Sequence, residues 1–156
     1  GNWALQSAVE TWFAHGNGDA FLFHEALLAA ADEVADTFDF GPFGRLSGLG
    51  RLAKRISIYY SRADKVLDDL SQTINGNRRL GQDGPPDRTD PAHFPSAAYR
   101  MVDCTGFADF PRDFQGSHQY YRRSPAVRAD IVSVTCDEAP LEDVYLTLVE
   151  QSEAAS

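Results

Sequence analysis

An aspartate and a histidine, Asp64 and His118, lie after two successive strand-like segments of the chain. Asp64 closes residues 55–64, in which isoleucines and tyrosines lead into a short polar loop. His118 follows the next strand-like run, between Gly116 and a pair of tyrosines. A carboxylate that orients a histidine makes the imidazole a general base for a serine hydroxyl. The acid before the histidine, each beyond a strand, therefore predicts the acid and base of an acyl-transfer triad.

The nucleophile of such a triad is missing from the sequence. An attacking serine needs a base within hydrogen-bond reach and a sharp turn, commonly Gly-x-Ser-x-Gly, to present it. No such pentad occurs in the 156 residues. Ser61 and Ser117 lie beside the two loops, but neither has the flanking glycines of that turn. The chain starts about where the turn would end, so Gly1 is interpreted either as its last glycine or as the remnant of a cleaved tag.

Each of these residues also has a purely structural interpretation. Asp64 precedes a helix-like segment from Lys65, so its carboxylate could cap that helix. His118 could be a loop histidine bonded to a nearby backbone group. Asp32, at the end of an earlier strand, is a reserve candidate for the acid, although a turn residue is the simpler interpretation.

The other reactive side chains form no recognisable site. We interpret Cys104 and Cys136 as a pair of buried thiols, because two cysteines make no disulfide framework. His15, His24 and His93 have no metal-ligand spacing with each other or with the cysteines. No glycine-rich phosphate loop occurs either. The sequence therefore predicts neither a metal nor another cofactor.

Three short apolar segments are predicted to be strands, at residues 26–31, 55–60 and 99–104. Helical spacing of apolar residues predicts an amphipathic helix over residues 3–15. Alternation of helices and strands favours an α/β fold, with a mostly parallel sheet covered on both faces. The candidate acid and histidine would then lie at the same edge of that sheet.

The connecting segments are also assigned from local signals. Residues 76–95 hold four prolines and three glycines, which predicts a long surface loop. Ser124 and Pro125 are typical of a helix start, with serine as the N-cap and proline at the first helical position. A last helical stretch is predicted from Pro140.

Size and charge exclude several classes of function. A chain of 156 residues predicts one domain, residues 1–156. Its net charge of −9, with no basic cluster longer than two arginines, argues against a nucleic-acid partner. No apolar run approaches the roughly 18 residues of a membrane span, and none resembles a signal peptide.

An ordered set of short motifs resembles an uncharacterised esterase/lipase-like family of alpha/beta hydrolases. The likeness extends over about residues 2–131, and it includes the acid loop that ends at Asp64 and the histidine loop around His118. The motifs that carry it are residues 2–5, 29–38, 55–64, 75–76, 80–81, 83–85, 102–105, 118–121 and 124–131.

The resemblance implies the C-terminal portion of a three-layer alpha/beta-hydrolase fold, whose three strands would be the last of the complete sheet. It also implies ester hydrolysis, with His118 as base and Asp64 as the acid that orients it. Because the nucleophile is absent, we expect the chain as given to be inactive. The competing hypothesis is a non-catalytic binding or oligomerisation module. The strand at residues 26–31 would be an open apolar edge, so we expect a homodimer through that edge.

Overall fold

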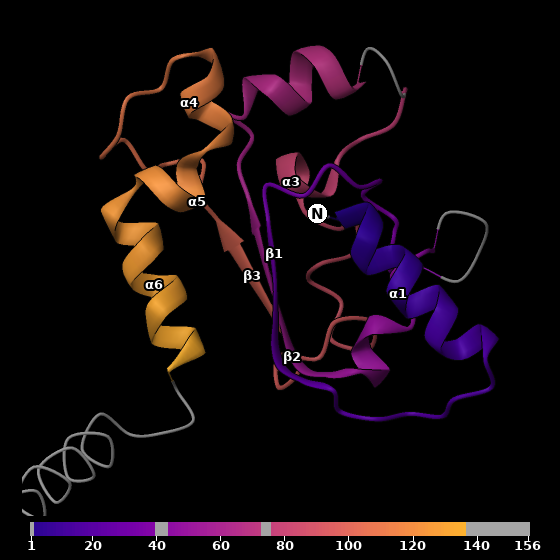
Figure 1. The fold of residues 1–156 in the computed structure, drawn as a ribbon. Helices are drawn as coiled ribbons and strands as arrows, with labels where there is room; N and C mark the ends of the chain where they lie inside the picture. Colours follow the sequence, from indigo (N-terminus) through magenta and orange to yellow (C-terminus); the bar gives the residue numbers. More distant parts are fainter. Residues whose placement is uncertain (1, 40–43, 73–75, 137–156) are drawn as a thin grey trace, which may run out of the picture.

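A computed structural model of the chain describes residues 2–39, 44–72 and 76–136 (Figure 1). Three strands form a parallel sheet in the order β1-β2-β3, with β1 at Phe23–Ala29, β2 at Ala53–Tyr60 and β3 at Tyr99–Asp103. Figure 1 shows the sheet between helix α1 (Asn2–Ala14) and helix α6 (Pro125–Thr135). The three-layer arrangement and the parallel strands confirm the predicted fold class.

Buried side chains of β2 point alternately to the two faces of the sheet, which explains why each face needs a covering helix. Ile56 and Ile58 are almost fully buried and pack in a cluster that includes Val9 of α1. Tyr59 points to the opposite face, where a second cluster includes Val127 of α6. Because successive side chains of a strand point to opposite faces, one strand supplies both cores.

Short helices lie between the strands and between β3 and α6. They are η1 (Leu49–Arg51, 3-10), a π-helical turn η2 (Leu67–Gln72), α3 (Leu80–Asp83), α4 (Phe114–His118) and α5 (Tyr120–Arg123). The predicted helix start at Ser124 is confirmed, because its hydroxyl accepts the Val127 N–H and caps α6. The helical stretch predicted from Pro140 lies outside the described residues.

The prediction of a long surface loop over residues 76–95 is wrong in part. Leu80 of α3 is fully buried, and the Gly81 N–H donates to the Ala31 carbonyl just after β1. A Cβ at Gly81 would lie 2.3 Å from the Ala31 nitrogen. The missing side chain therefore lets α3 lie directly against the backbone, which a count of prolines and glycines does not reveal.

Three smaller expectations also differ from the structure. Trp3 is 71% exposed, so the apolar stripe of α1 does not extend to its first turn. Strand β1 begins earlier than expected and ends before Ala30, whose φ of 49° breaks the extended backbone. Cys136 is exposed rather than buried, because it forms the C-cap of α6 beyond the last packed turn.

Candidate acid–histidine site

The acid loop begins where β2 ends. Asp64 closes a turn in which its N–H donates to the Ser61 carbonyl, and its side chain is fully buried. One carboxylate oxygen, Oδ1, accepts the N–H groups of Val66 and Leu67, each at 3.1 Å. Asp64 is therefore the N-cap of the helix that follows, as the structural interpretation of the sequence predicted. Its second oxygen, Oδ2, is left for another partner.

That partner is His118, at the last position of α4 rather than in an open loop. The Asp113 side chain accepts the Gly116 N–H at the start of α4 and fixes the helix there. His118 Nδ1 lies 2.8 Å from Asp64 Oδ2. Since an ionised carboxylate only accepts hydrogen bonds, Nδ1 carries the proton in this contact. The structure thus brings together the two residues that the sequence singled out.

The environment of the pair favours a basic imidazole. Hydrogen bonding to Asp64 raises the pKa of His118 above its ordinary value, and partial burial opposes this only in part. The His118 side chain is 31% exposed, whereas Asp64 is completely shielded. Among the described residues no partner binds the second ring nitrogen, Nε2. His118 is thus held through Nδ1, while its side chain remains partly exposed.

Two residues that the sequence analysis did not assign to the site hold His118 in place. The Ser117 hydroxyl accepts the Lys65 N–H at 3.0 Å and donates to the Phe114 carbonyl. It therefore ties α4 to the backbone directly beside Asp64. Ser117 had been weighed only as a nucleophile, and these two bonds give it a structural role instead.

Tyr120 makes the second attachment, from the other side of His118. Its buried hydroxyl donates to the Tyr59 carbonyl at 2.7 Å and accepts the Ala30 N–H at 3.0 Å. It thus connects the histidine segment with the ends of β1 and β2. The sequence places a tyrosine pair near His118, but no local signal shows which backbone groups the Tyr120 hydroxyl will reach.

The remaining residues considered as acid or nucleophile have other contacts in the structure. Asp32, the reserve acid, pairs with Arg79 at 2.9 Å, while Asp64 takes the histidine. Ser61 is buried, and its hydroxyl accepts the Ala63 N–H. Cys104 is buried as predicted, and burial raises the pKa of its thiol to about 12, so it is not a reactive nucleophile.

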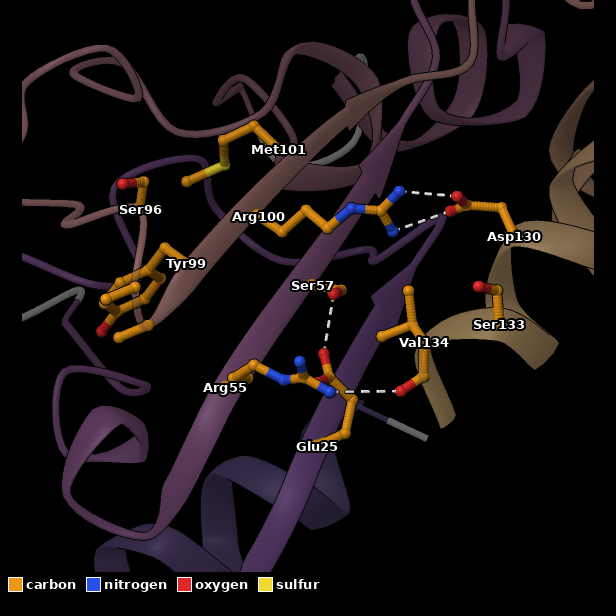
Figure 2. Close-up of a pocket in the computed structure, with 12 residues that line it drawn as sticks. Glu25, Arg55, Ser57, Ser96, Tyr99, Arg100, Met101, Asp130, Ser133 and Val134 are labelled. Atoms are coloured by element: carbon orange, nitrogen blue, oxygen red, sulfur yellow. Dashed lines mark hydrogen bonds and ion pairs between the residues drawn. The ribbon is translucent and has the colours of Figure 1, made fainter. Parts of the chain in front are cut away.

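A cavity of about 540 Å³ lies elsewhere, between the sheet and α6 (Figure 2). Glu25 and Arg55 form one ion pair in its wall, and Arg100 with Asp130 form a bidentate second. Glu25, Arg55 and Arg100 lie on strands well before the carboxyl edge, and Asp130 lies on α6. The pair of Asp64 and His118 is not in this wall. The two ion pairs described in the cavity wall neutralise each other's charges within each pair. We therefore place the candidate site at the carboxyl ends of the strands, where open α/β sheets bind their ligands.

The charged wall was not predicted from the sequence, although the sequence contains a signal for it. Glu25 and Arg55 are direct neighbours across β1 and β2, and Ser57 and Arg100 are neighbours across β2 and β3. Polar residues at the same register on adjacent strands indicate a polar patch on one face of a sheet.

Over the described ranges, no group of three or more histidine, cysteine or acidic side chains is placed to hold a metal ion. No helix in the same ranges is long and apolar enough to cross a membrane.

Comparison with known proteins agrees with the fold and with the resemblance. The profile of a family described as alpha/beta hydrolase of unknown function (DUF900) matches residues 1–135, most of the chain. No curated protein and no solved structure matches the chain significantly. The matched region includes all three strands and both residues of the acid–histidine pair. The chain therefore belongs to this family of alpha/beta hydrolases of unknown function.

Proposed function

We propose that Asp64 and His118 are the acid and base of a serine-hydrolase centre that cleaves esters, in the manner of an esterase or lipase. The observation that carries this proposal is the 2.8 Å contact between His118 Nδ1 and the fully buried Asp64 carboxylate. A buried acid that holds one nitrogen of a half-exposed histidine leaves the other nitrogen for proton transfer.

The chemistry follows from this geometry. A serine hydroxyl attacks the ester carbonyl, and His118 Nε2 takes its proton as the bond to carbon forms. The same proton then passes to the departing alcohol, which leaves an acyl-serine. Water then attacks the acyl carbonyl while His118 takes a proton from the water. Return of that proton to the serine oxygen releases the carboxylic acid and regenerates the serine. Throughout, Asp64 accepts the Nδ1–H and stabilises the imidazolium, and a general base of this kind contributes about 10²–10⁴-fold to the rate.

The 156 residues contain no Gly-x-Ser-x-Gly turn, so we expect the chain by itself not to hydrolyse esters. The test is hydrolysis of a short-chain p-nitrophenyl ester by the purified chain and by its His118→Ala variant. Equal background rates are expected. Hydrolysis by the chain that His118→Ala abolishes would show that a nucleophile is present after all.

The acid and base roles are tested in a longer protein, made by extending the chain through the reading frame upstream of residue 1. If a Gly-x-Ser-x-Gly turn lies there, the extended protein should hydrolyse the ester and react with a fluorophosphonate probe. Asp64→Asn and His118→Ala should each lower kcat by about 10²-fold or more. An extended enzyme that tolerates both changes would refute the proposed roles.

A second candidate function, self-association through β1, is favoured by a different observation. Strand β1 is an edge of the sheet, and its first residue, Phe23, is 44% exposed. Phe21 and Leu22, which precede the strand, are 67% and 48% exposed. Unpaired strand edges with apolar side chains invite pairing with another chain. We propose that two copies associate along this edge.

Sedimentation velocity tests the second candidate directly. The chain should sediment as a dimer, and Phe21→Ser should shift it toward monomer. Phe114→Ser is the matched control, because Phe114 is also exposed, at 41%, but lies far along the chain in α4. A monodisperse monomer whose β1 amides exchange rapidly would rule out the dimer.

A further inference from the structure

A small pocket opens at the carboxyl edge of the sheet, next to α3, and has no part in the proposed acyl transfer. Its volume is about 290 Å³, and three arginines line it: Arg62, Arg78 and Arg88. Arg62 lies just beyond the end of β2, and its N–H donates to the Thr105 hydroxyl just beyond β3. The pocket is therefore built on two adjacent strand ends, the part of an open α/β sheet where ligands bind.

The charge of this pocket is opposite to that of the protein. The whole chain carries a net charge of −9, yet three arginines and a single carboxylate, Asp83, line the pocket. Clustering of one sign of charge in a concave site raises the local concentration of ligands of the opposite sign. The pocket is thus a positively charged site that attracts anions, on a protein whose net charge is negative.

The guanidinium groups of these three arginines make few hydrogen bonds to the described residues. Arg62 lies 3.8 Å from Asp83 and 3.9 Å from Asp103, which is too long for a hydrogen bond in either case. Arg78 makes one contact of 3.0 Å with Asp83, through Nε. Elsewhere Arg100 and Arg45 each bind a carboxylate through two nitrogens. Each guanidinium has five N–H donors, so most donors around the pocket have no hydrogen-bond acceptor among the residues that the structure describes.

The backbone around the pocket brings the third arginine inward. Gly84 has a φ of +71°, in the left-handed region that glycine adopts without strain. The chain turns there, and Arg88 donates to the Pro85 carbonyl while its guanidinium lies 5.4 Å from the Tyr60 ring centroid. A planar guanidinium fixed over an aromatic face is pre-organised to meet a flat or tetrahedral anion.

We propose that the pocket formed by Arg62, Arg78 and Arg88 binds the anionic group of a ligand, a carboxylate or a phosphate. Guanidinium groups bind both kinds of anion through paired N–H···O bonds. The volume of about 290 Å³ is sufficient for one such group and lies at the lower end of pockets that bind small molecules, about 300–1,000 Å³. The proposal is independent of the acid–histidine pair.

The experiment is a titration of the full 156-residue chain with inorganic phosphate and, separately, with acetate, followed by amide chemical shifts at constant ionic strength. Saturable shifts are expected at residues 62, 78 and 84–88. The double variant Arg62→Gln/Arg88→Gln should raise the Kd at least tenfold. Saturation with phosphate alone assigns a phosphate-bearing ligand, and saturation with acetate assigns a carboxylate.

Arg128→Gln is the control, because Arg128 is an exposed arginine on α6 and does not line the pocket. It removes one positive charge and should leave both titrations unchanged. Thermal unfolding checks that all variants fold. Shifts that rise linearly without saturation would overturn the proposal, and so would a Kd that the pocket variant and the control change equally.

Discussion

The two oxygens of Asp64 have separate partners, so two substitutions should separate their contributions. Oδ1 caps the helix through the N–H groups of Val66 and Leu67, and Oδ2 binds His118. Asp64→Ala removes both functions. Asp64→Asn keeps an oxygen for the cap, since asparagine and aspartate are equally good N-caps, but removes the charge that holds the imidazolium.

The magnitudes follow from these contacts. Loss of an N-cap costs about 0.5–2 kcal/mol, and loss of the hydrogen bond between His118 and the charged carboxylate costs about 1.5–3 kcal/mol. Asp64→Ala should therefore lower the free energy of unfolding by about 2–5 kcal/mol, which is about 4–20 °C in Tm for a domain of this size. Asp64→Asn should lose only the hydrogen bond to His118 and keep the N-cap, so the two variants should differ in unfolding free energy by about 0.5–2 kcal/mol.

The contribution of the ion pair should also depend on pH. Because the pKa of His118 is raised in the folded state, its protonation stabilises the fold fully below its ordinary pKa of 6.5. That stability is lost as the pH rises through the folded-state pKa. The difference in unfolding free energy between the unaltered chain and Asp64→Asn should thus be larger near about pH 6 than near about pH 9.

Urea unfolding at several pH values measures the stabilities, and the histidine ring signals in NMR spectra give the pKa of His118. In Asp64→Asn this pKa should fall. Equal destabilisation by the alanine and asparagine variants would show that Oδ1 does not cap the helix. An unchanged His118 pKa in Asp64→Asn would show that the contact with Oδ2 is not formed in solution.

Three further changes test the surroundings of the site. Tyr120→Phe should cost about 0.5–1.5 kcal/mol in urea unfolding, because the Tyr59 carbonyl and the Ala30 N–H each lose the hydroxyl and keep only their mutual 3.3 Å hydrogen bond; a neutral effect would contradict the bonds to the hydroxyl. Gly81→Ala should cost about 1–3 kcal/mol or more through a backbone clash, whereas Gly106→Ala, with open space around it, should change stability by less than about 0.5 kcal/mol. A thiol reagent should modify the exposed Cys136 quickly and the buried Cys104 only on unfolding; equal rates would refute the burial of Cys104.

The sequence predicted those parts of the fold that depend on local patterns. The apolar run at residues 56–60 is buried on both faces of the sheet, and such runs are typical of central parallel strands. The serine and proline at residues 124–125 start a helix by capping and by a fixed φ, which are properties of those residues alone. Patterns of this kind need no knowledge of distant segments.

What the sequence did not predict depends on contacts between distant residues. The burial of α3 requires a glycine to meet the backbone beyond β1, and the role of Tyr120 requires a hydroxyl to reach two strand ends. The pairing of Asp64 with His118 was expected from chain order and from the family resemblance. Its geometry also needs Ser117, whose two hydrogen bonds no spacing rule indicates.

Several hydrogen bonds join the segment that carries His118 to the carboxyl edge of the sheet. His118 is held from three sides: by Asp64 itself, by Ser117 on the backbone beside Asp64, and by Tyr120 on the ends of both strands. Ala30, which donates to the Tyr120 hydroxyl, has a left-handed φ that costs an alanine about 1–2 kcal/mol. That strain persists only because the surrounding contacts fix it, and strain of this kind gathers at functional sites. A change at the strand ends should therefore alter the basicity of His118 even when it touches neither residue of the pair.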